Sequence, residues 1–452
     1  MTTYIKCGKL FDGVNDEICQ DCTIEVDGSD VVKIHTGTEA QSPKPTDEVI
    51  DLSNRFVMPG LIDIHTHLAY GNAKSEEDID LYAPIEFRTL RGLFFAKRVL
   101  GSGVTSLCAP GDAGQVSSAI RDAIDANLFD GPSVTAAGPY ITSRQGLTDW
   151  YPTWIGVPTT SIGRLVKSMD EAIEEIRRQT KDGVDVIKIA LDGIQRRPDG
   201  EYIAAFTEQE TIRMAAEIRR MGKRCFVHAR GREATLYAAK AGVDMIFHAS
   251  YMDDECLEWI VRNKCTVSPT FTLLVNSIEF MQPADPLWRK QRKQAYEAEL
   301  AAAYASARRL REAGVPLACG TDSGFAVTPY GEWHARELEI YVNHCGFSNI
   351  EALKAGTSIT ATMLRPRDRV GRIAPGYKAD IIAVDGNPAA DIMDLVERSK
   401  LVMVMKNGKP FTYDHREYDP RRVSDFAMTS WSDLYTQNRV RELRTQGAIK
   451  GA

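Results

Sequence analysis

The 452-residue sequence predicts an α/β protein, a (β/α)8 TIM barrel joined to a small β-sandwich domain that both ends of the chain build. Two observations lead to this fold class. In residues 57–370, apolar runs rich in β-branched residues alternate with helical patterns, as in repeated strand–helix units. In residues 1–56 and 371–415, short alternating segments are separated by turns, which is typical of antiparallel sheets. The length suits a barrel of about 250 residues plus a smaller domain.

The small domain is predicted from four segments. Its N-terminal part contains YIKCGKLFDGVND (4–16) and CTIEVDGSDVVKI (22–34), and its C-terminal part contains GRIAPGYKADIIAVDGN (371–387) and LVMVMKNGKPF (401–411). Residues 416–452 follow as a C-terminal extension. Because this extension is too apolar for a purely disordered tail, we expect it to pack on the barrel or on a neighbouring subunit.

The middle region contains eight candidate strands, the number that closes a barrel. They are FVMPGLIDIHTH (56–67), GVTSLCAP (103–110), SVTAAGPYI (133–141), VDVIKIAL (184–191), CFVHAR (225–230), DMIFHAS (244–250), CTVSPTFT (265–272) and VPLACGTDSG (315–324). Helices are predicted between strands at 86–103, 115–128, 169–183 and 206–222. In the last of these, Thr207 and Glu210 fit a capping box, and Gly222 suits the helix end.

Composition and charge narrow the class of protein. The chain is 43% hydrophobic and 26% charged with a net charge of -7, which gives no basic surface for nucleic acid. We find no apolar run of about 18 residues and no signal-peptide pattern, so we expect no membrane span and a cytoplasmic protein. Nine scattered cysteines indicate reduced thiols, and the lone pair Cys19 and Cys22 is interpreted as two free strand-borne thiols.

Unusual polar residues gather at the predicted strand ends. Histidines stand there at positions 65, 67, 228 and 248, four of the eight in the chain, and Asp322 ends the eighth strand. Lys188 lies inside the fourth strand, where an unpaired ammonium would be costly to bury. Barrel enzymes carry their functional groups at the C-terminal ends of strands. Because imidazole and carboxylate suit Zn²⁺ and similar ions, the pattern as a whole predicts a metal site.

With these residues in place, the sequence resembles the amidohydrolase superfamily, in the branch near imidazolonepropionase, prolidase-like dipeptidases and ochratoxinase-like amidases. The resemblance rests on GKLFDG, VMPGLIDIHTHL, GTDSG and GRIAPGYKADIIAVDGNP in that order, and it covers nearly the whole chain. It implies two divalent metal ions, expected to be Zn²⁺. It also implies that His65, His67 and Asp322 hold the more buried ion, that His228 and His248 hold the outer one, and that a carbamate of carboxylated Lys188 bridges them.

The resemblance also implies a mechanism. A metal-bound hydroxide attacks an amide-type carbonyl, and Asp322 is the catalytic residue that takes a proton and delivers it to the leaving nitrogen. For Asp322, a role as ligand alone remains the alternative. The substrate expected is a dipeptide, an N-acyl amino acid, or an aryl amide, carbamate or urea.

The residues that recognise the substrate are predicted less directly. The segment after the third strand carries four aromatic rings, at Tyr140, Trp150, Tyr151 and Trp154, which either line a pocket or pack on the barrel. Arg230 would point to the same side as His228, to hold a substrate carboxylate or to form a structural ion pair. Tyr251 and His334 are candidates for contact with the substrate or with the backs of the metal ligands, and structural roles remain open for both.

The sequence leaves two other classes of function as alternatives. A cyclic amidase or a deaminase acting on a heterocycle is the first alternative. Aminohydrolases of the superfamily usually have one metal and lack the fourth-strand lysine, so Lys188 favours amide-bond cleavage. A non-catalytic scaffold protein is disfavoured because every ligand position is filled. We expect a small-molecule substrate, no nucleic-acid or membrane partner, and a homo-oligomer.

Overall fold

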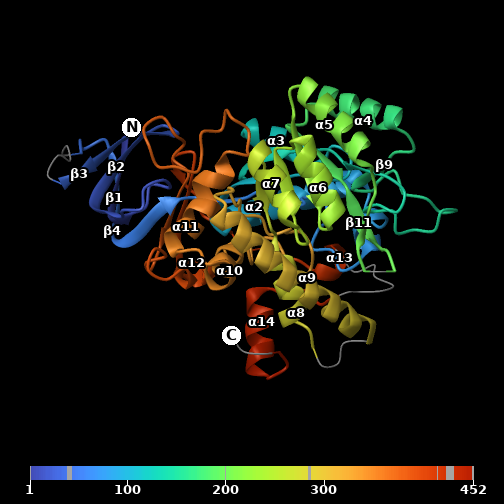
Figure 1. The fold of residues 1–452 in the computed structure, drawn as a ribbon. Coiled ribbons are helices and arrows are strands. Elements are labelled where there is room, and N and C mark those ends of the chain that lie inside the picture. The colour runs from blue at the N-terminus through green and yellow to red at the C-terminus, as the bar shows by residue number, and fades with distance from the viewer. Residues whose placement is uncertain are drawn as a thin grey trace.

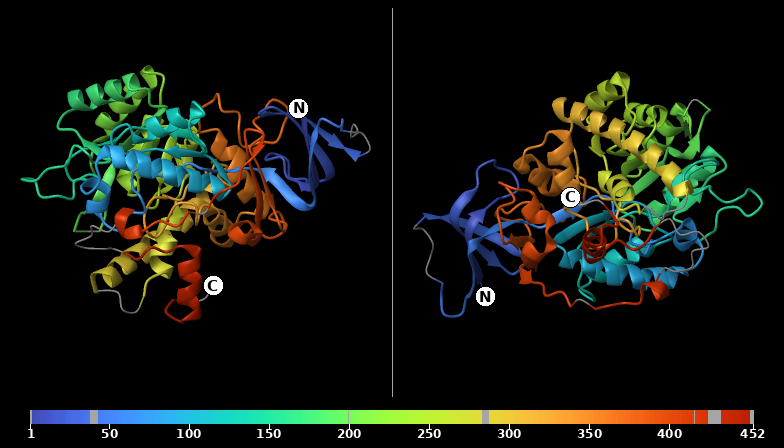
Figure 2. Two further views of the ribbon diagram at one scale, coloured as in Figure 1. Left: turned by 180° about the vertical axis from the view of Figure 1, so that it is seen from behind. Right: turned by 90° about the horizontal axis from the view of Figure 1, so that it is seen from below.

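The computed structural model describes residues 2–37, 43–198, 200–282, 287–414, 416–423 and 432–449. Both ends of the chain contribute to one small sheet, seen at one end of the molecule with the N-terminus (Figures 1 and 2). Its strands are β1 (Thr2–Leu10), β2 (Cys19–Asp27), β3 (Asp30–Thr36), β4 (Glu48–Pro59), β16 (Ile381–Val384), β17 (Leu401–Lys406) and β18 (Lys409–Pro410). The order is β18-β17-β16-β4-β1-β2-β3. Because β4 pairs with β1 on one side and with β16 on the other, hydrogen bonds join the strands into one seven-stranded sheet rather than two separate ones.

The strands of the middle region pair in parallel, as predicted for strand–helix units. One sheet contains β5 (Leu61–Asp63), β6 (Val104–Ala109) and β7 (Ser133–Ala136). The other contains β8 (Tyr140–Thr142), β9 (Gly163–Leu165), β10 (Val186–Ala190), β13 (Arg224–Ala229), β14 (Met245–His248) and β15 (Thr266–Ser268), in the order β15-β14-β13-β10-β8-β9. A short hairpin, β11 (Asp192–Arg196) and β12 (Tyr202–Ala204), follows β10.

Single backbone hydrogen bonds connect these two sheets to each other on both sides. The amide of Asp185 donates to Ala136 O (2.8 Å) between β10 and β7. On the other side, Ala318 N donates to Val267 O (2.8 Å), and Ile64 N donates to Cys319 O (2.9 Å). Residues 316–319 therefore lie between β15 and the end of β5.

Helices pack around the parallel strands, and others lie towards the small sheet and near the C-terminus (Figures 1 and 2). They are α1 (Glu76–Asp80), α2 (Ile85–Gly101), α3 (Val116–Asp125), α4 (Met169–Lys181), α5 (Glu208–Arg220), α6 (Arg232–Ala241), α7 (Asp254–Asn263), α8 (Phe271–Glu279), α9 (Leu287–Glu312), α10 (Arg336–Cys345), α11 (Asn349–Lys354), α12 (Met393–Val396), α13 (Pro420–Val423) and α14 (Gln437–Thr445), with the π-helical turn η2 (Ala355–Ile359) and the 3₁₀ turn η3 (Arg398–Lys400). The four predicted helices are confirmed as α2 to α5. The capping box at Thr207 and Glu210 is also confirmed, and Gly222 follows α5 with a left-handed φ of 70°.

Four predicted strands differ from the observed ones. The first, predicted at 56–67, is divided at Gly60, where a Cβ would lie 2.2 Å from the Thr105 side chain, so β4 ends in the small sheet and β5 begins the parallel one. The third is divided into β7 and β8. The seventh, predicted at 265–272, ends at Ser268, because α8 begins at Phe271. The eighth forms only isolated bridges, among them Val267 with Leu317 and Thr66 with Ser323. Pro316 has no amide hydrogen for a ladder, and Asp322 has a left-handed φ of 55°, so the chain bends away after a few residues.

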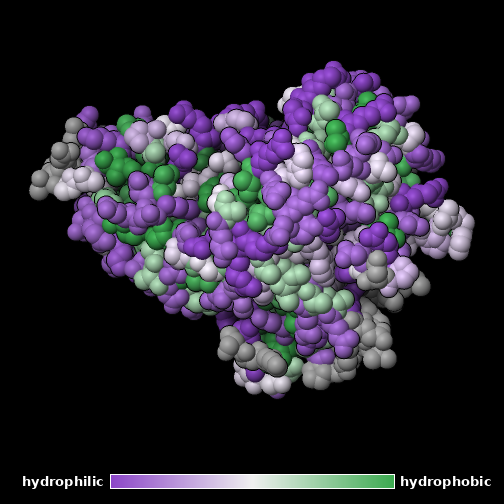
Figure 3. Space-filling view, in the orientation of Figure 1, coloured by the Kyte–Doolittle hydropathy of each residue, from purple (hydrophilic) through white to green (hydrophobic). Residues whose placement is uncertain are grey.

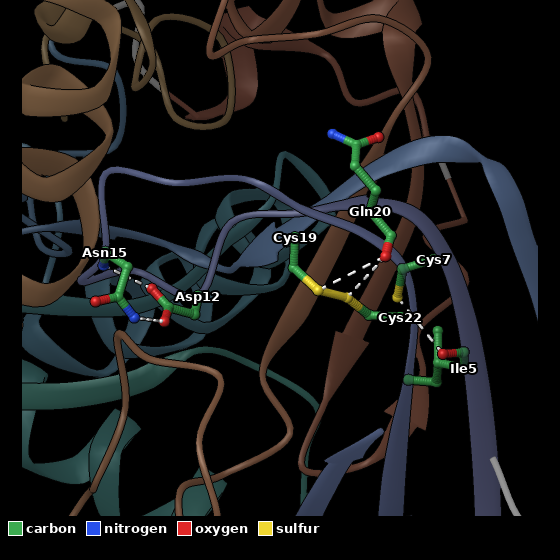
Figure 4. The surroundings of a disulfide bond; sticks show 7 residues. All are labelled: Ile5, Cys7, Asp12, Asn15, Cys19, Gln20 and Cys22. Carbon is green, nitrogen blue, oxygen red and sulfur yellow. Dashed lines mark hydrogen bonds between the residues drawn. A yellow bond between two sulfur atoms is a disulfide. The ribbon is translucent and has the colours of Figure 1, made fainter. Parts of the chain in front are cut away.

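The prediction that all nine cysteines are free thiols is wrong for one pair. Cys19 and Cys22 form a disulfide at the start of β2 (Figure 4). In a regular strand, residues three apart face opposite sides. Here the left-handed φ of 48° at Asp21 interrupts the alternation, so both sulfurs reach the same side. The other seven cysteines are buried free thiols, including Cys7, the strand partner of Cys22.

The face of the molecule drawn in Figure 3 is mainly polar. Figure 3 shows one face covered mainly by hydrophilic residues, with hydrophobic residues in small separate areas, one of them over the small sheet. Among the described residues, no helix is long and apolar enough to cross a membrane. The helix α14, near the C-terminus, lies beside α8 (Figure 1).

Candidate metal centre

Two histidines lie just after β5, and both rings face the same carboxylate oxygen. His65 Nε2 is 3.5 Å and His67 Nε2 is 3.2 Å from Asp322 Oδ1. The other ring nitrogen of His67, Nδ1, lies 2.6 Å from the carbonyl oxygen of Gly111. Because a carbonyl only accepts, Nδ1 carries a proton, and in the neutral ring Nε2 directs its lone pair at the Asp322 oxygen. Two acceptors that face each other at this distance indicate a place for a cation.

Lys188, on β10, has its amine inside the same cluster. Its Nζ lies 3.0 Å from His65 Nε2 and 4.6 Å from the centre of the Phe247 ring. The residue is only 2% exposed, and its burial lowers the pKa of the amine to about 8. The neutral form of the amine is therefore far more populated here than on an exposed lysine.

A second pair of imidazoles comes from the ends of β13 and β14. His228 Nδ1 and His248 Nε2 lie 3.0 Å apart. The outward nitrogens face other polar groups: His228 Nε2 is 3.2 Å from Asp192 Oδ1, and His248 Nδ1 is hydrogen-bonded to Thr270 Oγ1. Such outer partners fix the ring orientation of metal-binding histidines. The inner nitrogens of both rings are thus left to face the cluster.

The electrostatics favour neutral imidazoles. Burial, followed by the positive charge of Lys188, lowers the pKa of His65 well below its usual value. Burial, followed by the charge of Arg230, does the same for His248, and burial also lowers the pKa of His228. Neutral imidazole is the form that binds metal ions.

Backbone conformation sets the direction of several of these side chains. His248 has a φ of 78°, and Thr270 and Asp322 both have a φ of 55°. Non-glycine residues rarely adopt this left-handed region, and such residues cluster at functional sites. Each of the three follows or ends a segment that the parallel strands fix, so the surrounding structure holds the unusual conformation.

The donor set fits a metal ion. Ligand atoms of His65, His248 and Asp322 all lie within 4.8 Å of one another, and all three residues are buried. Imidazole and carboxylate together suit Zn²⁺ and related divalent ions. The six residues that the sequence analysis assigned to the metal site are therefore brought together at the C-terminal edge of the parallel strands.

A buried carboxylate behind the histidine pair connects β5 to the segment that carries Asp322. Asp63 accepts hydrogen bonds from His65 N (2.9 Å), Thr321 N (3.2 Å), Thr321 Oγ1 and His334 Nδ1 (2.7 Å). The Nε2 atom of His334 accepts from Gly331 N at 3.0 Å. His334 therefore supports the site through Asp63, and it is not among the residues that line the cavity described below.

We expect Asp63→Asn to lower the free energy of unfolding by about 1.5–3 kcal/mol, because a charged acceptor of several buried donors is lost. Urea denaturation of the variant, compared with Asp51→Asn at an exposed position of β4, measures this effect. A change no larger than that of the control would show that the four hydrogen bonds contribute little to stability.

A cavity of about 320 Å³ opens from the metal cluster. Of the aromatic residues predicted to line a pocket, Tyr140 and Trp150 line this cavity, and Trp150 Nε1 also donates to Asp80 Oδ2 (3.1 Å). Tyr151 and Tyr251 are not among its lining residues, and Trp154 is 87% exposed. The remaining wall is largely apolar, with side chains from α1, α8 and the loop after Asp322.

Arg230 lines the cavity beside a buried glutamate. Its Nη1 donates to Glu299 Oε1, and Glu299 also accepts from Tyr202 Oη (2.9 Å) and Ser250 Oγ (3.0 Å). Burial alone would raise the pKa of Glu299, but the charge and hydrogen bonds of Arg230 outweigh it and lower the pKa. Arg196 extends the positive charge, since its guanidinium stacks 3.8 Å from the centre of the Tyr202 ring. The cavity thus has a cationic side next to the metal cluster.

Three functional residues were missed from the sequence: Asp63, Asp192 and Glu299. Asp63 had a signal, because it is a carboxylate inside the apolar run GLIDI. Asp192 had a weaker signal, because it lies only two residues after the end of β10, the strand that carries Lys188. Glu299 lies on the long charged helix α9, 69 residues from Arg230, where nothing local distinguishes it.

Known proteins resemble this chain over most of its length. The sequence pattern of the amidohydrolase family matches residues 56–411. Ochratoxinase of Aspergillus niger is 28% identical over 407 residues, which cover 85% of this chain and 82% of that protein. Imidazolonepropionase of Syntrophobacter fumaroxidans is 25% identical over 382 residues, with 80% and 82% covered. The crystal structure of a Xaa-Pro dipeptidase with methionine bound in its active site superimposes with a TM-score of 0.79 at 28% identity, covering 91% of this chain and all of that one.

Proposed function

The chain belongs to the amidohydrolase family, and from this premise we propose that it hydrolyses amide-type carbon–nitrogen bonds of small molecules with divalent metal ions. One observation carries the proposal. Four imidazoles, the Lys188 amine and the Asp322 carboxylate converge at one end of a cavity. The similarity to ochratoxinase and to a Xaa-Pro dipeptidase supports an amide bond as the target.

We propose further that the parallel strands close into a (β/α)8 barrel over residues 57–370. The hydrogen bonds that join the two parallel sheets on both sides support closure, with residues 316–319 in the place of the eighth strand. Residues 1–56 and 371–415 then form the small domain, and residues 416–452 form an extension. This arrangement places the metal cluster at the C-terminal end of the barrel, where enzymes of this architecture carry their active sites.

The residues suit a binuclear centre, for which we propose Zn²⁺. His65, His67 and Asp322 would hold one ion, and His228 and His248 the other. Lys188, carboxylated by CO₂ to a carbamate, would lie between the two; its lowered pKa supports this, because the neutral amine is the form that reacts. Bound ions would polarise the substrate carbonyl and lower the pKa of a water molecule.

Side chains of the protein transfer the proton of the reaction and exclude water from the site. Asp322, whose carboxylate faces both histidines of the first pair, accepts a proton during attack on the carbonyl and returns it to the leaving nitrogen. Tyr70 stacks on His67 with ring centres 4.2 Å apart, and Phe247 covers Lys188. These rings exclude bulk water, which strengthens the electrostatic interactions inside the site.

A hydrolysis screen tests the proposed function. The zinc-loaded protein is incubated with dipeptides, N-acyl amino acids, and anilide, carbamate and urea compounds, and release of the amine is measured. We expect turnover in at least one of these classes. Turnover only of cyclic amides, or only release of ammonia from heterocycles, would contradict cleavage of a linear amide.

Arg230 is proposed to bind a substrate carboxylate. Only one nitrogen of its guanidinium, Nη1, has a hydrogen bond to Glu299, and the group lines the cavity, so further donors remain for an anionic ligand. The loss of one charge-assisted contact costs about 1.5–3 kcal/mol. We therefore expect Arg230→Ala to lower kcat/KM about ten- to a hundredfold for carboxylate-bearing substrates and to spare neutral ones.

Steady-state kinetics on a matched acid and methyl ester measure this difference. Because Arg230→Ala leaves the buried Glu299 without its partner, the double variant with Glu299→Gln is the control for a structural effect. Equal losses on acid and ester in both variants would mean that Arg230 stabilises the site and that the substrate need not be an acid.

A further inference from the structure

One part of the cavity wall is apolar. It includes Leu273 on α8 and the residues Phe325, Ala326 and Val327, which follow Asp322 in the chain. These side chains offer no charge or strong hydrogen bond to a ligand. A substrate group on this side is therefore recognised by its apolar surface and its size.

The C-terminal segment, residues 432–449, packs directly behind this wall. Val327 belongs to a buried cluster with Tyr435, and Leu273 and Phe325 pack against the same cluster, whose other buried members are Phe280, Trp333, Val440, Leu443 and Ile449. Tyr435 is fully buried, with its ring centre 5.3 Å from that of Phe280. Three side chains thus line the cavity and also belong to, or pack against, the cluster that the C-terminal segment helps to form.

Hydrogen bonds fix the same contact. Tyr435 N donates to Ala326 O (3.0 Å), and Trp333 Nε1 donates to Tyr435 O (2.8 Å). The side chain of Gln437 donates to Glu332 O (2.7 Å). The segment therefore holds both ends of the stretch from Ala326 to Trp333, and Ser432 itself lines the cavity.

The segment lies outside the part of the chain that matches the family, which ends at residue 411. The metal cluster and the wall residues lie inside the matched part, whereas the segment that supports the wall lies outside it. We propose that residues 432–449 determine specificity by setting the size and position of the apolar wall, and that the group accommodated there is the bulky or aromatic acyl part of the amide. This inference rests on the proposed function and assigns its substrate class.

The test compares two substrates with the same amino acid, an N-acetyl and an N-naphthoyl derivative. Tyr435→Ala removes the supporting ring but keeps both backbone hydrogen bonds, and Ser432→Trp adds bulk at the cavity from a residue that is not a member of the buried cluster. The matched control is Arg441→Ala, on the exposed side of α14. We expect both wall variants to lose at least about tenfold in kcat/KM for the naphthoyl substrate, the change that about 1.4 kcal/mol of lost aromatic packing produces. The acetyl substrate and the control should stay within about twofold of wild type.

Binding of naphthoate by calorimetry separates this inference from the proposed function. If wild type binds naphthoate and the two wall variants weaken it while Arg441→Ala does not, the inference holds even for a protein that turns over neither amide, and only the proposed function fails. Absence of naphthoate binding to wild type would overturn the inference, as would equal losses on both substrates. If Tyr435→Ala fails to fold, Ser432→Trp decides: unchanged naphthoate binding in that variant overturns the inference.

Discussion

Treatment with a chelator is expected to abolish hydrolysis, and Zn²⁺, Co²⁺ or Mn²⁺ should restore it. Without ions, the facing acceptors His67 Nε2 and Asp322 Oδ1 have no cation between them, and neither carbonyl polarisation nor an acidified water remains. Elemental analysis of the fully active protein should give about two divalent ions per chain, as in binuclear hydrolases. Active protein with one ion or none would contradict the binuclear proposal.

Histidine variants provide a matched comparison for the metal measurement. His228→Ala should lose one of the two ions together with activity. His344→Ala is the control, because this histidine is exposed on α10 and stacks on Tyr304 with ring centres 4.6 Å apart, away from the cluster. Equal metal loss in both variants would point to general destabilisation rather than to a ligand role for His228.

Replacement of Lys188 should reduce metal content and activity about as much as treatment with a chelator. Loss of a group behind a metal ligand typically costs about 10–100-fold in affinity or activity, and a bridging ligand should cost more. We expect Lys188→Ala to lose metal and nearly all activity, and added short carboxylic acids to restore part of both. Carbon-13 NMR of protein prepared with labelled bicarbonate should show a carbamate in wild type and none in the variant.

Lys188→Met separates chemistry from folding. It keeps the apolar stem and removes an amine that is costly to bury, so the metal-free variant should unfold at a temperature no lower than metal-free wild type. It should nevertheless be inactive. A structure of active, metal-filled enzyme with an unmodified amine at Lys188 would contradict the carbamate.

The placement of five of the six cluster residues followed from one local rule, that functional groups stand at the ends of barrel strands. Lys188 lies inside its strand and was singled out by the cost of burying an ammonium. The rule needs only approximate strand positions, so it tolerated the division of the first strand at Gly60 and the near absence of the eighth. It gave no access to Glu299 or Asp63, because their roles arise from contacts with residues 69 to 271 positions away. Nor can a run of aromatic residues show which rings face inward: Tyr140 lines the cavity, whereas Trp154 is exposed.

The disulfide between Cys19 and Cys22 shows a different limit. Strand alternation separates residues three apart, and only the left-handed conformation of Asp21 brings the sulfurs together. The disulfide thus depends on the φ angle of one residue, Asp21, which the strand pattern of the sequence does not specify.

The pairing of β4 with β16 has a consequence for how the chain is made. Pro59 pairs with Ile381, so more than 300 residues must leave the ribosome before the open edge of β4 meets its partner. At about 5–20 residues per second this takes on the order of 15–60 s. Throughout that time β1 can cover one side of β4, but the other side presents unpaired amides and carbonyls to any passing strand. The nascent chain is therefore most exposed to mispairing while the parallel strands and their helices are being synthesised, and its yield in a cell should depend on chaperones that occupy this edge until the C-terminal strands arrive.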